Sequence, residues 1–365
     1  MTPKDAEILD LFAGGGGWSE GLRMLGLRDV GLEWDAAACA TSAAARHTTI
    51  RCDVSQYPTE PFKGRIKGKI SSPPCQGWSR AGLGLSLLDQ PLVHQAVEDL
   101  ARGHDTRADL AAACRDKRSI LAAEPMRWLY DLRPEWVAME QVPDVLPLWR
   151  QYAEILRGWG YSVWYGLLNA ADYGVSQTRT RAILAASRAR GVAPPMPTHS
   201  EHGLGPDLFG EHRPAWVSME DALNLPSGMR VNTRGNRRTS GGNEFPCDRP
   251  SWALTEKARS WWVLRHSKRS NATVRRTDQP AATLVAGHAR LDYQWIKVGG
   301  QGDLEKRPLL LSEAAVLQGF PPDYPFQGSE SRRFLQIANA VPPLLAAHVI
   351  AAATGVPVRE SQKAA

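Results

Sequence analysis

The sequence contains few cysteines, and none of them forms a pattern typical of a metal site or a disulfide framework. Five cysteines occur in 365 residues, with no Cys-x-x-Cys pair and no histidine at a zinc-like spacing. These absences exclude a zinc finger and a disulfide-stapled secreted domain, so we expect no structural metal and a reducing, intracellular setting. The cysteines are Cys39, Cys52, Cys75, Cys114 and Cys247.

Long apolar runs and a secretion signal are also missing. No stretch is apolar over enough residues to cross a bilayer, and no signal peptide precedes the first strand pattern. We therefore expect a cytoplasmic protein with no membrane partner. The hydrophobic content of 43% is sufficient for a real core, and the net charge of +6 favours a polyanionic partner.

The N-terminal residues have the pattern of a nucleotide-binding strand, turn and helix. Residues 8–12 are typical of a buried strand, residues 13–17 form a glycine-rich turn, and a helical pattern runs from Trp18 to Leu25. Glycines let a ligand approach the backbone closely, and a helix N-terminus offers free N–H groups to it. This unit predicts a phosphate or nucleotide ligand at the turn.

Acidic residues follow the next two strand patterns. Residues 30–35 place Glu33 about 20 positions after the glycines, where nucleotide folds use a carboxylate to bind ribose hydroxyls. Trp34 offers a flat face for an adenine, and Asp53 offers a carboxylate for the exocyclic amine of that base. Taken singly, each could equally be an ordinary core or surface residue. Together they predict a cofactor that carries adenosine.

One cysteine directly follows a short apolar strand, on a turn stiffened by two prolines. Pro73 and Pro74 restrict the backbone before Cys75, and glycines beyond it allow a mobile loop. A thiolate held in this way can attack an electron-poor ring carbon. A lone intracellular cysteine is more often structural, so the assignment depends on the other motifs.

In their order along the chain, these motifs resemble those of the DNA (cytosine-5)-methyltransferase family, of bacterial or phage type. The resemblance covers most of the chain, and so many motifs in the right order do not agree by chance. The matching segments are the turn at 10–17, Glu33 and Trp34, Asp53, the catalytic cysteine motif 74–76, the Glu-Asn-Val motif at 139–143, the Gln-x-Arg-x-Arg motif 177–181, and the segments 276–283, 317–321 and 336–343.

Three features depart from the family pattern. Gln141 replaces the usual asparagine, and Ala338 replaces a usual glycine, which alanine can do if its φ is negative. Residues 84–114 form a segment longer than the family usually carries, with apolar spacing that predicts a helix. Two interpretations of this segment stay open: a surface insertion without a role, or an extension of a loop that closes over the substrate.

The resemblance implies a defined chemistry. Cytosine C5 is a poor nucleophile, so the Cys75 thiolate first adds to C6, and C5 then attacks the methyl group of S-adenosylmethionine. Glu140 donates or shares a proton at N3, while Arg179 and Arg181 orient catalytic groups or a phosphate. The target cytosine must be flipped out of double-stranded DNA. No side chain is assigned to removing the C5 proton.

The resemblance also implies which residues bind the two ligands. The expected cofactor-binding residues are Asp10, Phe12, Ala13, Gly14, Gly15, Gly16, Gly17, Glu33, Trp34, Asp53, Pro74, Asn339 and Val341. The expected substrate-binding residues are Gln76, Ser79, Val142 and Gln177, together with Arg230, Arg234, Arg237 and Arg238.

The alternation of strand and helix patterns sets the expected domains. Residues 1–187 alternate and predict an α/β domain with a Rossmann-like, mostly parallel methyltransferase sheet. Residues 188–275 are rich in Gly, Pro, Arg and Trp and predict a smaller, irregular, mainly β target-recognition domain. Residues 276–365 return to complete the first domain, with helices at 312–317 and after Pro343.

The arginines at 230–238 have two interpretations. Four arginines within nine residues, flanked by glycines, could form a loop that enters a DNA groove, where arginine forks read guanine edges or grip phosphates. They could also form a solvated surface loop.

The predicted function is methylation of cytosine C5 at a specific duplex DNA site. Two alternatives remain at this point: a tRNA-directed relative, or a DNA-binding relative that has lost catalysis. The intact Cys75, Glu140, Arg179 and Arg181 argue against the second. We expect a monomer that is associated with the nucleoid when bound to DNA. The recognised site, and whether a cognate restriction endonuclease accompanies the chain, are left open by the sequence.

Overall fold

The computed structural model describes residues 7–74, 78, 85–205, 212–224, 230–232, 244–246, 259–260, 262–265, 274–284, 294–297 and 306–358. Some expected site residues lie outside this part of the chain. They are Cys75, Gln76, Ser79, Arg234, Arg237 and Arg238, and Arg230 is described only as the first residue of a strand.

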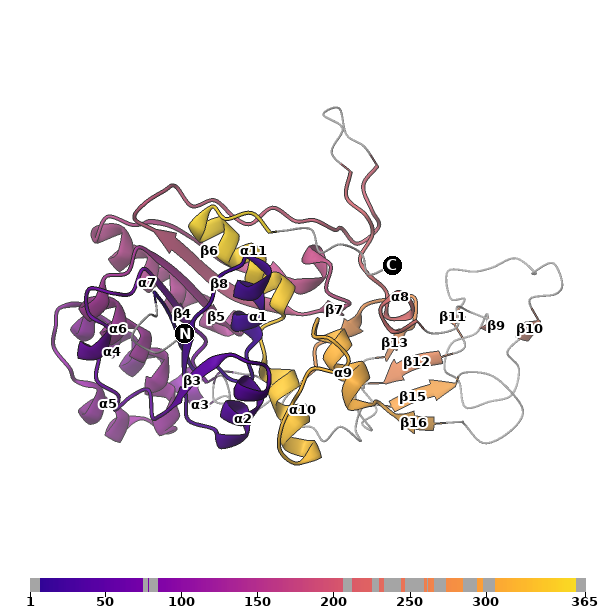
Figure 1. The fold of residues 1–365 in the computed structure, drawn as a ribbon, viewed down its shortest axis with the longest axis horizontal. Helices are drawn as coiled ribbons and strands as arrows, with labels where there is room; N and C mark the ends of the chain where they lie inside the picture. The colour runs from indigo at the N-terminus through magenta and orange to yellow at the C-terminus, as the bar shows by residue number, and fades with distance from the viewer. Residues whose placement is uncertain are drawn as a thin grey trace.

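A seven-stranded sheet forms the centre of the larger domain, in the order β3-β2-β1-β4-β5-β8-β6 (Figure 1). All its strands run parallel except β8, which is antiparallel to both of its neighbours. This confirms the predicted Rossmann-like α/β fold. The strands are β1 (Ile8–Leu11), β2 (Val30–Glu33), β3 (Thr48–Arg51), β4 (Gly68–Ser71), β5 (Trp136–Gln141), β6 (Ser162–Asn169) and β8 (Thr180–Ser187).

The strand order reverses between β1 and β4. From β1 the chain first adds β2 and β3 on one side, and then β4 and β5 on the other. In open parallel sheets, ligands bind in the crevice at the carboxyl ends of the strands where this reversal occurs. The fold therefore places a binding site beside the ends of β1 and β4.

Helices cover both faces of the sheet. On one face, α1 (Gly17–Met24) packs beside the C-terminal helix α11 (Pro343–Thr354), so the two ends of the domain meet there (Figure 1). On the other face lie α6 (Glu124–Leu132) and α7 (Leu146–Gly158), whose apolar sides share one core with β5 and β8.

The segment expected to be an insertion forms three helices in its described part. These are α3 (Leu85–Leu88), α4 (Gln90–Ala101) and α5 (Arg107–Ala113). The helix predicted from apolar spacing is α4, and it buries Val93, Ala96, Val97 and Leu100 in the core shared with α6 and α7. This helix is therefore part of the core of the larger domain.

Short strands form the smaller domain, next to the α-helix α8 (Met219–Leu223). One sheet has the order β13-β12-β15-β16, and another has the order β10-β9-β11. The first sheet continues past the expected boundary at residue 275, because two of its strands lie after it. The strands are β9 (Arg230–Asn232), β10 (Glu244–Pro246), β11 (Arg259–Ser260), β12 (Trp262–Arg265), β13 (Val274–Arg276), β15 (Gln294–Lys297) and β16 (Lys306–Pro308).

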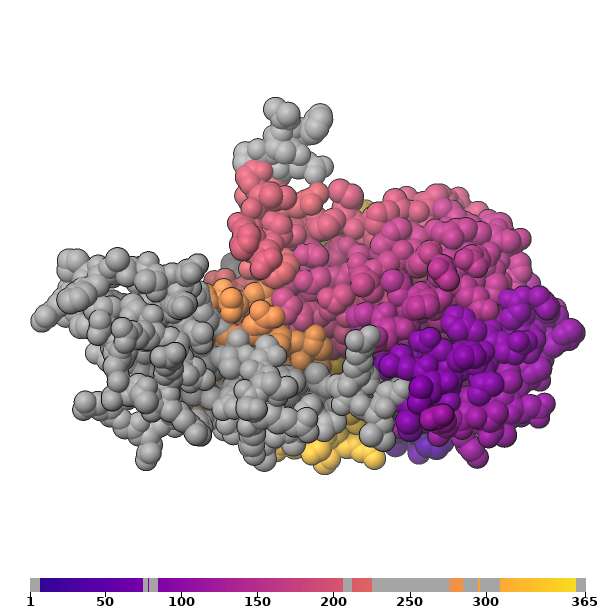
Figure 2. Space-filling model, turned by 180° about the vertical axis from the view of Figure 1, so that it is seen from behind, coloured from indigo at the N-terminus to yellow at the C-terminus, as the bar shows by residue number. Residues whose placement is uncertain are grey.

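A two-stranded parallel pair joins the domains. β7 (Gln177–Thr178) pairs with β14 (Ala281–Ala282), which brings residues about a hundred positions apart into register. In the view from behind in Figure 2, the orange residues of the β14 segment lie against magenta residues of the larger domain. The chain then returns through α9 (Leu311–Leu317), α10 (Glu330–Asn339) and α11. α9 and α11 confirm the helices predicted at 312–317 and after Pro343, whereas α10 was not predicted.

Among the described residues, one stretch, Glu330–Thr354, is long and apolar enough to cross a membrane by length and composition alone. The expectation that no stretch is apolar over enough residues was therefore wrong for these residues. In the structure this stretch is two helices, α10 and α11, separated by extended backbone at Ala340. Because 67% of its apolar window is buried inside the protein, it has the character of a core helix.

Candidate active site

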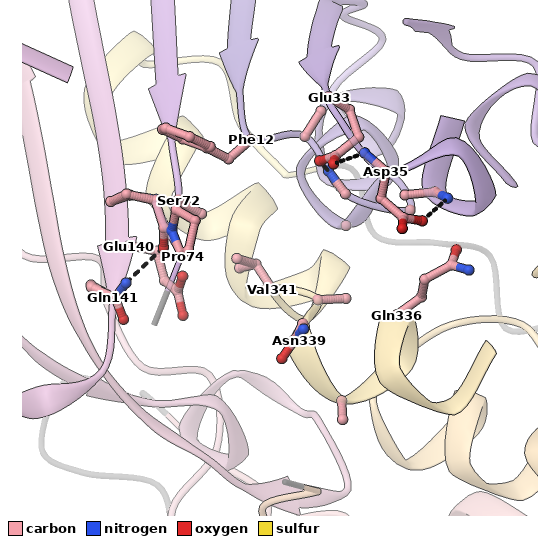
Figure 3. A pocket seen from close by; sticks show the side chains of 18 of the residues that line it. Phe12, Glu33, Asp35, Ser72, Pro74, Glu140, Gln141, Gln336, Asn339 and Val341 are labelled. Carbon is pink, nitrogen blue, oxygen red and sulfur yellow. Dashed lines mark hydrogen bonds between the residues drawn. The ribbon is translucent and has the colours of Figure 1, made fainter. Parts of the chain in front are cut away.

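A cavity of about 1150 Å³ opens at the carboxyl ends of the sheet strands. Its wall combines the ends of β1, β2, β4 and β5 with residues of α10 from the C-terminal segment. Figure 3 shows Glu33 and Asp35 at one end, Glu140 and Pro74 at the other, and Val341 and Asn339 between them. The predicted cofactor residues at this wall are Phe12, Ala13, Gly14, Gly15, Gly17, Glu33, Trp34, Asp53, Pro74, Asn339 and Val341.

The Glu33 carboxylate is fixed by three backbone donors. One oxygen accepts from the N–H of Gly14 at 2.8 Å, and the other accepts from Trp34 at 2.9 Å and Asp35 at 2.7 Å (Figure 3). Burial raises the pKa of Glu33, and these three hydrogen bonds oppose the rise. The result is a rigid acceptor at one end of the cavity that also ties the glycine turn to β2.

Two further predicted residues stand at the same end. Trp34 leaves 71% of its surface exposed, although it follows a buried strand. Asp53 follows β3, and its Oδ1 accepts from the N–H of Ser55 at 2.9 Å and from the hydroxyl of Ser55 at 2.7 Å. This end of the cavity therefore offers an exposed aromatic ring and an oriented carboxylate.

The glycine turn is shaped as much by the C-terminal segment as by the cavity. A Cβ on Gly17 would lie 2.3 Å from the carbonyl oxygen of Val341, so only glycine fits there. Gly16 has φ near +99°, a conformation that glycine adopts without strain, and it does not line the cavity. Gly16 is therefore needed for the backbone conformation of the turn and does not contact the cavity. The Tyr324 hydroxyl adds a bond to the Gly15 carbonyl at 2.7 Å.

Asp10 does not reach the cavity. Its side chain is fully buried in β1, and neither carboxyl oxygen has a hydrogen-bond partner among the described residues. Burial, with Asp29 and Glu33 nearby, raises the pKa of Asp10 well above its ordinary value. Asp10 therefore lies beneath the site.

An ion pair stands at the opposite end of the cavity. Nε of Arg181 lies 2.9 Å from Oε1 of Glu140, and both side chains are largely buried. The two residues come from neighbouring antiparallel strands, β8 and β5. Arg181 also donates to the carbonyl of Thr180 at 2.7 Å, which holds its guanidinium in place. The pair fixes one carboxylate oxygen and leaves the carboxylate at the cavity wall.

Gln141 keeps the amide function that the family places at this position. Its side-chain NH₂ donates to the carbonyl of Pro73 at 2.7 Å, and its side-chain oxygen accepts from the N–H of Val142 at 2.5 Å (Figure 3). The side chain therefore ties the end of β5 to the chain two residues before Cys75. Ala338 lies inside helix α10, so its φ is negative and alanine is tolerated there.

The three named residues of the Gln-x-Arg-x-Arg motif have different roles in the structure. Gln177 is fully buried, donates to the side-chain oxygen of Gln318 at 2.9 Å, and lies away from the cavity wall that it was expected to join. Arg179 does line the cavity and is almost fully buried, with Nη1 3.5 Å from the Leu284 carbonyl. Gln177 thus joins the two domains, whereas Arg179 and Arg181 face the site.

Several residues at the cavity were not among the predicted site residues, and Asp35, Arg332 and Gln336 are three of them. Arg332 on α10 forms an ion pair with Asp35, the residue whose side chain caps α2 (Ala36–Ala44). Gln336 accepts from the Thr41 hydroxyl at 2.6 Å. Asp35 carried a signal, because it is an N-cap residue directly after a strand. Arg332 carried none, since its partner lies almost 300 positions away.

Lys69 is a buried cation beneath the site. It lies in β4, fully buried, and its Nζ donates to the Ser71 hydroxyl at 2.6 Å. Burial lowers the pKa of Lys69 to about 7. An unfolded lysine has a pKa of about 10.4, so between these two values the unfolded chain binds more protons than the folded one. The free energy of unfolding therefore rises with pH across this window, by up to about 1.4 kcal/mol per unit from this group.

Replacing Lys69 with methionine is expected to raise the melting temperature, and to raise it more at pH 6 than at pH 9. At pH 6 the folded native chain must hold a buried ammonium, and this cost fades as the pH rises. Thermal unfolding of Lys69→Met at both pH values measures the difference. The exposed Lys67 provides the control, Lys67→Met. An equal shift at both pH values would contradict the burial argument.

Comparison with known proteins identifies the same family that the sequence motifs resemble, over nearly the whole chain. The family model described as C-5 cytosine-specific DNA methylase matches residues 6–102 and 107–354. The match therefore continues through most of the expected insertion and omits only residues 103–106 within it.

Similar proteins of known description span nearly the whole chain. Type II methyltransferase M1.HphI of Haemophilus parahaemolyticus is 27% identical over 358 residues, covering 93% of this chain and 84% of the relative. Type II methyltransferase M.NgoPII of Neisseria gonorrhoeae is 26% identical over 372 residues and covers 96% of each. Among solved structures, the S. pombe Dnmt2 methyltransferase has a TM-score of 0.57 at 14% identity, covering 96% of this chain and 98% of the other.

Proposed function

We propose that the cavity binds S-adenosylmethionine at the Glu33 end and a flipped cytosine at the Glu140 end. The chain belongs to the C-5 cytosine-specific DNA methylase family and is a DNA cytosine-5 methyltransferase. One observation carries the proposal: a single cavity connects the two groups of predicted residues. Its volume of about 1150 Å³ exceeds the range typical of one small ligand, so it has room for a methyl donor and a base together.

The Glu33 end suits the adenosine of the methyl donor. A carboxylate offers about four acceptor positions, and three on Glu33 are used by backbone N–H groups, which leaves one side to accept from a ribose hydroxyl. Trp34 supplies an exposed ring for the adenine, and Asp53 accepts from its amine. S-adenosylmethionine, when bound, supplies the methyl group from its sulfonium.

The Glu140 end suits the cytosine. We propose that the Cys75 thiolate adds to C6 and that Glu140 protonates or shares a proton with N3 as charge develops there. Arg181 holds the Glu140 carboxylate in place, and Gln141 holds the chain before Cys75 through Pro73. C5 then forms a bond to the methyl group as its bond to the donor sulfur breaks, and loss of the C5 proton finally lets the thiolate leave. Water is the proposed acceptor of that proton.

Recognition of the DNA site is proposed to lie in the smaller domain. The arginines of the 230–238 segment could grip phosphates or read guanine edges in duplex DNA. We also propose that the protein acts as a cytoplasmic monomer, associated with the nucleoid on DNA. A cognate restriction endonuclease is a further proposed partner, because the relatives named above are described as Type II methyltransferases.

Transfer of a radiolabelled methyl group tests the proposal. With labelled S-adenosylmethionine, the protein should label duplex DNA and leave transfer RNA unlabelled, and the product should be 5-methylcytosine. Sequencing methylated cytosines in a host that expresses the chain would then identify the recognised site. Labelling of RNA alone would overturn the assignment of the substrate, and no transfer to either would support a relative that only binds DNA.

A further inference from the structure

The buried carboxylate of Glu124 does not line the cavity, but it connects helices α5 and α6 to the loop that follows β3. Glu124, at the start of α6, is only 1% exposed. It accepts from Nε of Arg127 at 2.7 Å, from the indole N–H of Trp128 at 3.0 Å, and from Arg107 at the start of α5. Glu124 therefore orients two arginines at once.

Both arginines also donate to backbone carbonyls of that loop. Arg127 donates to the carbonyl of Val54 at 2.9 Å and to that of Tyr57 at 3.0 Å. Arg107 donates to the carbonyl of Ser55 at 3.1 Å. Three carbonyls within four residues are thus held from outside the cavity, by side chains that do not line it.

The same loop presents Asp53 to the cavity. Asp53, Val54 and Ser55 all line the wall, and Ser55 donates twice to the Asp53 carboxylate. Any shift of the Ser55 backbone would move this donor pair and rotate the carboxylate. The direction of Asp53 therefore depends on the arginines that hold Val54 and Ser55.

Energetics favour positioning over stability as the reason for this cluster. Removing each charge from water costs several kcal/mol, and well-packed apolar residues in place of a buried ion cluster often give equal or higher stability. Burying a carboxylate with two arginines is therefore an inefficient way to stabilise α5 and α6. The cluster does provide directed N–H donors at fixed places, which apolar packing cannot supply.

We propose that Glu124, Arg107 and Arg127 are positioning residues that set the adenine selectivity of the methyl-donor site through the loop of Asp53. The proposal rests on the proposed function, which places the adenine at Asp53. It also gives a role to the segment around α5. Asp105 holds Arg107 through two hydrogen bonds of 2.8 and 2.7 Å, and it lies within the residues 103–106 that the family model does not match.

The test compares binding of S-adenosylhomocysteine with binding of its inosine analogue, in which a carbonyl replaces the exocyclic amine. Calorimetry on the native chain should show a clear preference for adenine. Arg107→Met should reduce this preference about fivefold, which is the effect expected from weakening one hydrogen bond. Because Arg107 does not line the cavity, kcat at saturating donor should remain near the native value while the KM for the donor rises. Arg127→Met should behave in the same way.

Two further variants separate positioning from general destabilisation. Asp53→Ala should remove the adenine preference, and adding Arg107→Met to it should cause no further loss of preference. Arg102→Met is the matched control, because Arg102 is exposed directly after α4 and pairs only with Glu98 among the described residues. It should leave the preference unchanged.

The outcomes distinguish the inference from the proposed function. If Asp53→Ala removes the preference and Arg107→Met keeps it, the positioning role is wrong and the donor site stands. A preference that survives Asp53→Ala overturns the inference and the assignment of Asp53 to the adenine amine, because Asp53 then does not read the adenine. If Arg107→Met and Asp53→Ala reduce the preference additively, the arginine does not act through Asp53, and the inference fails.

Discussion

Replacing Cys75 with alanine is expected to abolish methyl transfer while leaving DNA binding nearly intact. C5 of cytosine becomes nucleophilic only after a thiolate has added to C6, and alanine supplies no nucleophile. Although Cys75 lies outside the described residues, Pro74 lines the cavity and Gln141 anchors Pro73. Labelled methyl transfer and a DNA-binding titration on Cys75→Ala measure the two effects separately.

A duplex with 5-fluorocytosine at the target position provides the direct readout. Fluorine cannot leave C5 as a proton does, so the native chain should remain covalently attached to this DNA, and Cys75→Ala should not. An adduct with Cys75→Ala would show that another thiol reacts.

The other described cysteines are poor candidates for the nucleophile. Burial raises the pKa of Cys39 and of Cys52 to about 11, so both thiols stay protonated at neutral pH. Burial also raises the pKa of Cys114, which lies at the end of α5, away from the cavity wall. Cys52→Ala is therefore a suitable control and should retain transfer and adduct formation.

The sequence predicted the parts of the site that sit at strand ends. Glycines after β1, Glu33 at the end of β2 and Glu140 near the end of β5 each occupy a place dictated by local pattern, because parallel strands bring their carboxyl ends together. A residue type that suits a ligand, combined with a position next to a buried strand, was sufficient to bring these groups to one cavity.

What the sequence could not give depends on contacts between distant segments. Gln177 was assigned to substrate from its motif, but the pairing of β7 with β14 places it in a buried junction with Gln318. Glu124 reads locally as an ordinary acidic residue in the first turn of a helix. Its partner Arg107 and the carbonyl of Ser55 are brought to it only by the tertiary fold. The domain boundary at 275 was obscured in the same way, since β15 and β16 complete a sheet begun before it.

The substitution Glu140→Gln is expected to lower kcat by a factor of about 10²–10⁴, which is the contribution typical of general acid catalysis. S-adenosylmethionine and DNA should still bind. Glutamine has nearly the same shape as glutamate and can donate a hydrogen bond, but it has no proton to transfer to N3 as the thiolate adds. The structure fixes the position of Glu140, because Arg181 lies 2.9 Å from one carboxylate oxygen in a largely buried site.

Single-turnover kinetics on Glu140→Gln measure the chemical step apart from product release. The exposed Glu154 on α7 provides the matched control, Glu154→Gln, which should keep the native rate. The 5-fluorocytosine adduct gives a second readout: it should form slowly with Glu140→Gln, because proton transfer at N3 accompanies the addition of Cys75 rather than the methyl transfer that follows. If the adduct formed at the native rate while methyl transfer was slow, Glu140 would act after the addition, and its assignment as the acid at N3 would be wrong.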